Sequence, residues 1–329
     1  MSELIDSQVQ LLNSMGLLET IRECRILITG AGGFVGLHLC EALAGLGADV
    51  HALSRNAEKR NFPVGVKPHS VDLRDIESVK ACLEHVKPDI VFHLAGLVNT
   101  RQHLDLVLPT LKNNLIGSVN LFVALSEGSV DRVVVVGSSE EPAAGRLGAV
   151  ANSPYAAAKE AETDYAWMFH NIFSLPVVLA RPFMSYGPRQ PIEKIIPYVI
   201  TRLLSGEEPA ISSGRRVCDL IYVQDLVMGL ILSGFKPGLT GATIDLGVGI
   251  GVTIRDAVNV ISELIDVPVK PNFGAIPDRL YEEPQIADGE GTFRQIGYRP
   301  HWSLYEGIKT TIEWYRTHPE FFQSERRSV

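Results

Sequence analysis

The stretch Arg25–Leu43 decides the fold: Arg-Ile-Leu-Ile-Thr-Gly-Ala-Gly-Gly-Phe-Val-Gly-Leu-His-Leu-Cys-Glu-Ala-Leu. The apolar run at residues 26–28 predicts a buried strand, and apolar residues at helical spacing from Phe34 onward predict a helix. Three glycines lie between them: Gly30, Gly33 and Gly36. Glycine removes Cβ where a chain turns tightly and where a pyrophosphate approaches the backbone. The stretch therefore predicts a dinucleotide-binding turn, with a plain glycine-rich turn as the alternative.

Composition narrows the class of protein. Of the 329 residues, 46% are hydrophobic and 21% are charged, which is typical of a soluble globular chain. The net charge of −8 and the lack of a Lys/Arg-rich run argue against nucleic-acid binding. No apolar run is long enough to span a bilayer, and no secretion signal is visible, so we expect no membrane contact. The four cysteines lack Cys-x-x-Cys spacing, which favours free thiols in a reducing cytoplasm and no metal site.

The second expected strand, residues 49–53, is followed by Ser54 and Arg55. In dinucleotide folds the residues at this place meet the adenosine ribose. A carboxylate here would bind both ribose hydroxyls, whereas Ser54 and Arg55 can bind a 2′-phosphate. The pair favours NADP(H) over NAD(H), although NAD remains possible and Arg55 could simply face solvent.

Two further strand ends continue this pattern. After the third strand, Asp72 can accept a hydrogen bond from the adenine amino group, and Asp75 is expected to cap a helix that begins near Ile76. The fourth strand, residues 90–94, ends in Ala95-Gly96, whose small side chains let the backbone pass close to the nicotinamide ribose. His93 within that strand is interpreted as a core histidine.

Candidate acid/base residues follow the fifth strand, residues 133–136. The strand ends in Gly137-Ser138-Ser139-Glu140-Glu141, at the edge where open α/β sheets bind ligands. Tyr155 and Lys159 lie one turn apart at the start of a predicted helix. A phenol has a pKa of about 10, and we expect the neighbouring ammonium to lower it. With Ser138 holding the substrate oxygen, the three groups form a proton relay between an alcohol and a ketone; the alternative is a surface Tyr and Lys at a common helical spacing.

Together these motifs resemble the extended short-chain dehydrogenase/reductase family, which contains nucleotide-sugar epimerases, dehydratases and reductases. The resemblance runs from about Arg25 to the C-terminus. The matching segments are residues 29–36, the Asp72 region, 93–96, 114–121, 138–141, Tyr155 with Lys159, 181–190, 219–225 and 277–279.

The resemblance implies roles for individual residues. Tyr155 would be the catalytic acid/base, and Lys159 would bind the nicotinamide ribose. Ser138, or Ser139 as the fallback, would hydrogen-bond the reacting sugar oxygen, and Glu140 would stand where dehydratases carry a glutamate. The implied cofactor-binding residues are Gly30, Gly33, Phe34, Val35, Gly36, Ser54, Arg55, Asp72, Leu73, Leu94, Ala95, Gly96, Asn114, Tyr155, Lys159 and Pro182. The implied substrate-binding residues are Met184, Arg216 and Arg279, the last on the diphosphate.

Four departures from the family pattern affect the sugar pocket. Pro142-Ala143 replaces the usual Tyr-Gly, and the loop from Glu141 to Ser153 is short. Met184 replaces an asparagine that faces the sugar in many members. Cys218 replaces an arginine that reaches the diphosphate, although Arg215 and Arg216 are close by.

The expected architecture is a doubly wound parallel sheet of the Rossmann type with a smaller α+β C-terminal substrate domain. We expect an N-terminal helical extension over 1–23, a dinucleotide-binding domain over 24–182, and a substrate domain over 183–329 with segments that return to the sheet. The favoured activity is a 4-keto-sugar reductase acting at C4 of a nucleoside-diphosphate sugar. A 4-epimerase, a 4,6-dehydratase, a reductase of other carbonyl compounds and a non-catalytic dinucleotide-binding regulator remain alternatives. The resemblance also implies a homodimer formed by the helices that carry Asn114 and Tyr155, with residues 167–169 either as contacts of that dimer or as core residues.

Overall fold

In the computed structural model of this protein, the described residues are 9–142, 150–281 and 283–323. They divide into two compact units. The first comprises the chain up to Pro182 together with Val227–Asp245 and Arg294–Gly297. The second comprises Phe183–Leu226, Leu246–Phe293 and the chain from Tyr298 onward.

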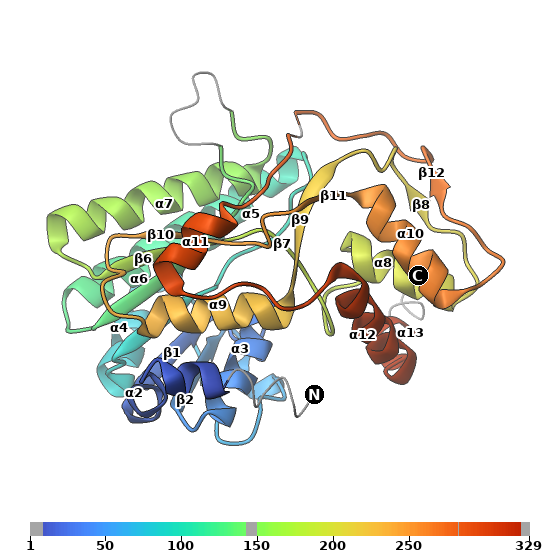
Figure 1. Ribbon diagram of the computed structural model, residues 1–329. Helices are drawn as coiled ribbons and strands as arrows, with labels where there is room; N and C mark the ends of the chain where they lie inside the picture. The colour runs from blue at the N-terminus through green and yellow to red at the C-terminus, as the bar shows by residue number, and fades with distance from the viewer. Residues whose placement is uncertain (1–8, 143–149, 282, 324–329) are drawn as a thin grey trace. The chain divides into compact units, whose positions relative to one another are not determined.

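A seven-stranded sheet forms the centre of the first unit (Figure 1). Its order is β10-β6-β5-β4-β1-β2-β3, and the strands from β6 through β3 pair in parallel. The strands are β1 Arg25–Thr29, β2 Asp49–Ser54, β3 Lys67–Ser70, β4 Ile90–His93, β5 Arg132–Val136, β6 Val177–Pro182 and β10 Thr243–Leu246. Its central strands are continuous apolar runs because helices cover both faces of the sheet. The predicted Rossmann-type fold is confirmed.

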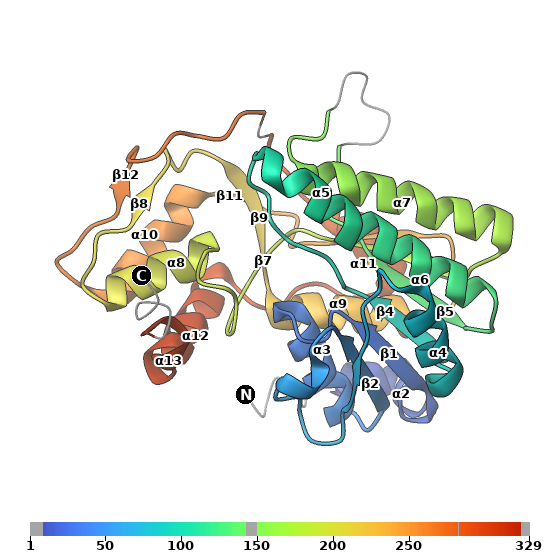
Figure 2. The ribbon, with the colours of Figure 1, turned by 180° about the vertical axis from the view of Figure 1, so that it is seen from behind.

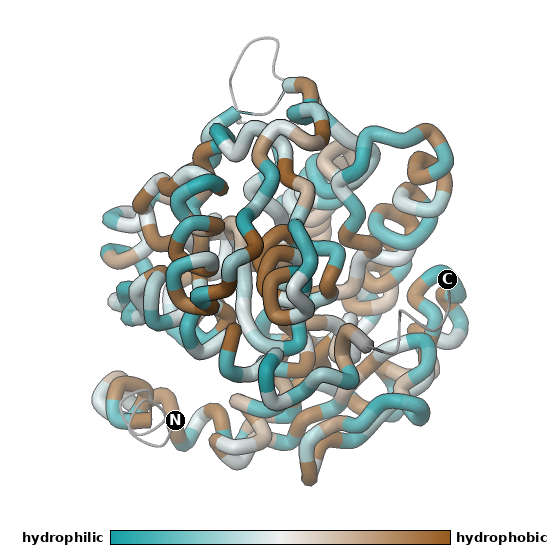
Figure 3. Tube along the Cα trace, turned by 90° about the vertical axis from the view of Figure 1, so that its right-hand side faces the viewer, coloured by the Kyte–Doolittle hydropathy of each residue, from teal (hydrophilic) through white to brown (hydrophobic). Residues whose placement is uncertain are grey.

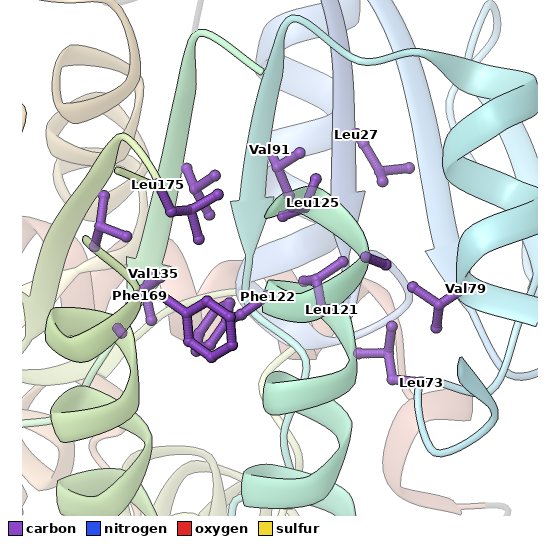
Figure 4. Close-up of a cluster of buried hydrophobic side chains, with 14 of the residues drawn as sticks. Leu27, Leu73, Val79, Val91, Leu121, Phe122, Leu125, Val135, Phe169 and Leu175 are labelled. Atoms are coloured by element: carbon purple, nitrogen blue, oxygen red, sulfur yellow. The ribbon is translucent and has the colours of Figure 1, made fainter. Parts of the chain in front are cut away.

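Helices lie on opposite sides of this sheet (Figures 1 and 2). The helical elements of the first unit are α2 Leu18–Glu23, α3 Phe34–Gly45, η1 Ala57–Lys59, α4 Ile76–Val86, η2 Leu104–Leu106, α5 Val107–Thr110, η3 Leu111–Ile116, α6 Gly117–Ser126, α7 Pro154–Phe173 and most of α9 Val223–Phe235. On one side, α4, α6 and α7 enclose a hydrophobic core against the strands (Figure 4). On the other, Gly234 of α9 lies so close to the Phe92 ring that a Cβ would clash with it.

Three aromatic or apolar residues of α7 pack in or against the core of the first unit. Phe169 packs against Phe122 of α6, with ring centroids 5.6 Å apart, and belongs to the buried cluster in Figure 4. Trp167 and Met168 pack against the same cluster. Residues 167–169 therefore contribute to the core of the first unit, and a dimer contact through them stays a prediction.

The N-terminal segment packs onto the first unit. Residues 9–14 are helical, and the chain then breaks at Gly16, whose φ is +69°, before α2 begins. Leu12 and Ile21 are fully buried, so the amphipathic pattern predicted from the sequence anchors this segment.

The second unit is built on two small sheets. The three-stranded sheet has the order β11-β9-β7 and the two-stranded sheet pairs β12 with β8. The elements are β7 Met184–Tyr186, α8 Ile195–Leu204, β8 Ala210–Ile211, β9 Val217–Tyr222, β11 Gly251–Thr253, α10 Ile254–Ile265, β12 Asn272–Phe273, most of α11 Gly289–Ile296, α12 Leu304–Thr317 and α13 Glu320–Gln323. Hydrophobic and hydrophilic segments alternate along the helices in Figure 3, as expected for helices with one buried face.

The described part of the chain carries neither a membrane span nor a metal cluster. None of its helices is both long and apolar enough to cross a bilayer. Within the same residues, no group of three or more His, Cys, Asp or Glu side chains could hold a metal ion.

Candidate functional site

The glycine turn after β1 is closely packed. Gly30 has a φ of +68°, and a Cβ there would lie 2.7 Å from the Ala95 amide nitrogen. A Cβ on Gly36 would overlap the Gly30 carbonyl oxygen. Gly33 is the N-cap of α3, and no side chain caps the helix. The first-turn amides of α3 are thus left to bind an anion, which fits the pyrophosphate of a dinucleotide.

Basic residues lie near this turn. Arg55 follows β2, is exposed, and donates through Nη1 to Asn113 Oδ1 at 3.3 Å. The Arg60 side chain lies against the turn itself, because a Cβ on Gly32 would be 3.3 Å from Arg60 Nε. Sequence reasoning missed Arg60. The signal in the sequence is that Arg60 is the second basic residue after Arg55, and η1 brings the chain back to the turn.

Asp72 and Asp75 have different partners. Asp72 accepts from Arg74 Nε at 2.9 Å and Nη2 at 2.5 Å, and these hydrogen bonds lower the pKa of Asp72. Asp75 Oδ1 accepts from the Glu77 and Ser78 amides, which confirms the predicted cap of α4. Asp72 is therefore an ionised acceptor at the end of β3, with Arg74 as its present partner.

Asn114 joins the fourth strand end to the following helix. Its Oδ1 accepts from the Leu97 amide at 2.7 Å, just beyond Ala95 and Gly96. The predicted tie is present, although it reaches the segment after β4 and not the strand itself. Asn114 lies in η3, a π-helical turn, a feature often found at functional sites.

Tyr155 and Lys159 come together with Ser138 at the end of β5. Ser153 caps α7 by accepting from the Ala156 amide at 3.1 Å, which starts the helix one residue before Tyr155. Tyr155 is 6% exposed and Lys159 is 4% exposed, and the Ser138 side chain acts to lower the pKa of Tyr155. Lys159 Nζ donates to the carbonyl of Val136, the last residue of β5, at 2.7 Å. Both residues are therefore internal groups and not members of a solvated helix face.

The neighbours of Ser138 occupy different environments. Ser138 Oγ accepts from the Glu140 amide at 3.1 Å, while the Ser139 amide donates to the Pro182 carbonyl at 3.1 Å. Ser139 and Glu140 are partly exposed. Glu141 is buried, a feature that sequence reasoning did not find. Pro142 is described, whereas Ala143 lies outside the described residues.

Buried charges determine the electrostatics around the phenol. Burial raises the pKa of Tyr155, and Lys159 and the Ser138 hydrogen bond oppose that rise without cancelling it. The expected effect of the ammonium is present, because Lys159 acts to lower the pKa of Tyr155, but burial is the larger influence and the net direction is upward. Burial is the largest single influence on Lys159 and disfavours its cation, but Glu162, Tyr155 and Glu141 together outweigh it, so the pKa of Lys159 is raised.

His93 is a core residue, as predicted. Its Nδ1 lies 2.7 Å from Thr29 Oγ1, its Nε2 lies 2.7 Å from Ser118 Oγ, and it is fully buried. Burial, followed by the charge of Lys159, lowers the pKa of His93 to about 3. The ring is therefore neutral at physiological pH.

The candidate substrate residues all belong to the second unit. Met184 is partly buried in β7, and Cys218 is buried in β9. The amide and hydroxyl of Ser213 both donate to Asp278 Oδ1, and Arg215 Nη2 lies 3.6 Å from Asp278 Oδ2. These contacts bring residues 213–216, including Arg216, beside the segment that carries Arg279. Arg255, which donates to the Ser213 carbonyl at 2.7 Å, adds a further cation.

Comparison with known proteins establishes the class. The model of the NAD dependent epimerase/dehydratase family matches residues 26–241. The chain belongs to this family, an enzyme family among the extended short-chain dehydrogenases/reductases, which confirms the resemblance found in the sequence motifs.

Individual relatives span more than one activity. A dTDP-glucose 4,6-dehydratase of Actinoplanes sp. and a UDP-glucose 4-epimerase of Mycolicibacterium smegmatis are each 28% identical, covering 89% of this chain and 98% of each relative. The UDP-glucose 4-epimerase of Thermus thermophilus, solved in complex with NAD, is 26% identical with a TM-score of 0.80, over 89% of this chain and 99% of that one. An epimerase of Methanothermobacter thermautotrophicus shares the fold, with a TM-score of 0.86 at 24% identity over 94% of this chain and 97% of that one.

Proposed function

We propose that this enzyme transfers a hydride between a nicotinamide dinucleotide and C4 of a nucleoside-diphosphate sugar. The observation that carries the proposal is the pair of buried residues Tyr155 and Lys159, one helical turn apart on α7, with Lys159 held at the end of β5 just before Ser138. These groups belong to the same unit as the glycine turn. The relatives that act on dTDP-glucose and UDP-glucose support the substrate class.

The candidate site residues of the first unit each have a part in this reaction. The bound nicotinamide would supply or accept the hydride. The α3 N-terminus would hold the pyrophosphate, and Lys159 would hold the ribose. Ser138 would hold the reacting oxygen, and Tyr155 would give that oxygen a proton during reduction or take it during oxidation.

We propose NADP(H) as the preferred cofactor. Arg60 lies against the glycine turn and Arg55 lies exposed beyond β2, so two guanidinium groups are available to a 2′-phosphate. Ser54 ends the same strand. NAD(H) is the alternative cofactor, because the similar Thermus thermophilus structure was solved in complex with NAD.

Within this chemistry, a 4-keto-sugar reductase is the first candidate. A net reductant suits NADPH, and a phenol that keeps its proton near neutral pH suits donation to a keto oxygen. Glu141 is bound to the Ser138 amide and to Thr163, so of these two glutamates Glu140 is the better placed to serve a dehydratase as a second acid/base. The names of the relatives favour the second candidate, a 4-epimerase or 4,6-dehydratase that regenerates its own cofactor.

We further propose that the second unit, within residues 183–329, binds the nucleotide sugar. Arg215, Arg255 and Arg279 gather around Ser213 and Asp278 there. Guanidinium groups pair well with diphosphate oxygens.

A homodimer is proposed from the exposed apolar side chains of the first unit. Elements α5, η3, α6 and α7 contact one another and lie side by side in Figure 2. Their exposed apolar residues, with those of η2, are Leu104, Val107, Leu108, Leu111, Ile116, Tyr165, Ile172 and Phe173. The free thiols of all four cysteines fit the proposed cytoplasmic location.

Incubation of the purified protein with nucleotide sugars tests the proposal, with the absorbance of reduced nicotinamide as the readout. Stoichiometric oxidation of NADPH by a nucleoside-diphosphate 4-keto-sugar would support the reductase. Turnover of UDP-glucose or dTDP-glucose without added cofactor would support the epimerase or dehydratase. If neither occurs, and Tyr155→Phe retains full biological activity, the regulator becomes the better explanation.

A further inference from the structure

A carboxylate that the proposed reaction does not use lies beside Lys159. Glu162 follows Lys159 by three residues in α7, and its Oε2 lies 2.8 Å from Lys159 Nζ. The Glu162 side chain is 1% exposed. A buried ion pair costs several kcal/mol of desolvation, which the attraction between its members only partly recovers. Stability alone is therefore a weak reason for this pair at the centre of the site.

We propose that Glu162 is a positioning residue for the Tyr155–Lys159 pair: it fixes the Lys159 ammonium and offsets its charge beneath the phenol. This inference rests on the proposed function, because it concerns the acid/base chemistry of Tyr155.

Two contacts hold the Lys159 ammonium. Nζ donates to the Val136 carbonyl at 2.7 Å and forms an ion pair with Glu162 Oε2 at 2.8 Å. The ion pair is a close contact of opposite charges without hydrogen-bond geometry, since neither Glu162 oxygen has a hydrogen-bond partner among the described residues. The strand-end carbonyl and the carboxylate thus constrain Nζ together. Without Glu162, the ammonium would be held only by the strand end.

Neutral groups surround the other side of Glu162. Its Oε1 lies 3.5 Å from His93 Nε2, which also contacts the Ser118 hydroxyl. The Ser118 hydroxyl donates to the Asn114 carbonyl and also acts to lower the pKa of Glu162. His93 is neutral at physiological pH because burial lowers its pKa to about 3, so Lys159 is the cation that faces Glu162.

The charges around the phenol explain how Glu162 offsets the charge of Lys159. Around the Tyr155 phenol the interior holds one ammonium, Lys159, and two carboxyl groups, Glu141 and Glu162. Burial raises the pKa of both carboxyls, and Lys159 opposes that rise in each. Because ionised Glu162 cancels part of the ammonium charge, the phenolate of Tyr155 is stabilised less than a lone lysine would stabilise it. Tyr155 thus stays protonated to higher pH, as a proton donor to a keto oxygen requires.

The test follows the ionisation of Tyr155 in the full-length protein without substrate, using ¹³C-labelled tyrosine and NMR. Tyr155→Phe identifies the resonance. In Glu162→Gln, the acid dissociation constant for the first proton of the Tyr155–Lys159 pair should rise at least tenfold. The midpoint of that titration should therefore fall by about one pH unit. Glu160→Gln is the matched control, because Glu160 is an exposed glutamate of the same helix, and it should leave the titration unchanged.

Glu162→Asp provides a second variant should the glutamine variant fold poorly. Its shorter side chain keeps the charge but withdraws it from Lys159, so we expect a smaller movement in the same direction. The inference is overturned if the titration midpoint of folded Glu162→Gln is unchanged or higher. If Glu162→Asp replaces it as the test variant, the same outcome applies, and Glu162 then forms only a structural ion pair. Because no turnover is measured, this result is independent of whether any nucleotide sugar proves to be a substrate.

Discussion

The carboxylate of Glu141 turns inward and accepts a hydrogen bond from the Ser138 amide at 2.6 Å. Its other oxygen accepts from the Thr163 hydroxyl at 2.9 Å. A Cβ on Gly137 would lie 2.7 Å from Glu141 Oε1, so the glycine leaves room for the carboxylate. Glu141 therefore links the end of β5 to α7 and orients the serine that contacts Tyr155.

This arrangement predicts a pH-dependent effect of Glu141→Gln on stability. Glutamine keeps both contacts, because its oxygen can accept from Ser138 and its NH₂ can donate to Thr163 Oγ1. Burial raises the pKa of Glu141 in the fold, so its contribution to stability is present at low pH and is lost as pH rises through the folded pKa. Above pH 4.5, the ordinary pKa of a glutamate, the native chain should lose stability relative to the variant. The difference between their free energies of unfolding should change by up to about 1.4 kcal/mol per pH unit in favour of the variant.

Urea unfolding at several pH values measures this difference, with Glu160→Gln as the exposed control. A difference that stays constant with pH would show that the buried carboxyl does not titrate differently in the two states.

Ser138 and Ser139 can be separated by paired alanine variants. The Ser138 side chain acts to lower the pKa of Tyr155, whereas Ser139 contacts Pro182 through its backbone amide, which alanine keeps. Ser138→Ala should lower kcat roughly 10²–10³-fold, comparable to loss of an oxygen-binding donor, and should raise the pKa of Tyr155. Ser139→Ala should stay within about threefold of the native kcat. Turnover and the Tyr155 titration provide separate readouts, and the reverse ranking would transfer the role to Ser139.

The sequence was sufficient for the fold and for much of the site. Apolar runs located the parallel strands, and the glycine spacing located the turn before α3. The Tyr155–Lys159 spacing also placed both side chains on one helical face, because that relation depends only on local geometry.

Properties that depend on distant packing were not predictable in this way. A Lys-x-x-Glu spacing is common on exposed helices, so nothing in it indicated that Glu162 is buried. The raised pKa of Tyr155 was missed for the same reason, since desolvation depends on how β5 and α7 pack. The contact of Arg60 with Gly32 required the path of the chain through η1.

Two glycines of α3 provide a test of the turn. A Cβ on Gly36 would overlap the backbone of the glycine turn, whereas one on Gly45 would meet nothing within 4 Å. Gly36→Ala should lower the free energy of unfolding by about 1–3 kcal/mol and weaken cofactor binding. Gly45→Ala should be neutral or raise it by about 0.5 kcal/mol. Urea midpoints and the rise in melting temperature with NADP⁺ measure both effects, and equal behaviour of the two variants would contradict the close approach.

The proposed preference for NADP(H) depends on Arg55 and Arg60. A 2′-phosphate bound by two guanidinium groups gains charge-assisted hydrogen bonds that NAD(H) cannot make. Arg55→Ala and Arg60→Ala should therefore each weaken NADPH binding by about tenfold, or about 1.4 kcal/mol, while changing NADH binding less than about threefold. The control is Lys80→Ala, which removes an exposed cation of α4 that is paired with Glu127. It should change neither affinity. Fluorescence titrations with both reduced cofactors measure these ratios. Equal losses for NADH and NADPH would show that the arginines act on the shared part of the dinucleotide, and the cofactor assignment would then revert to NAD(H).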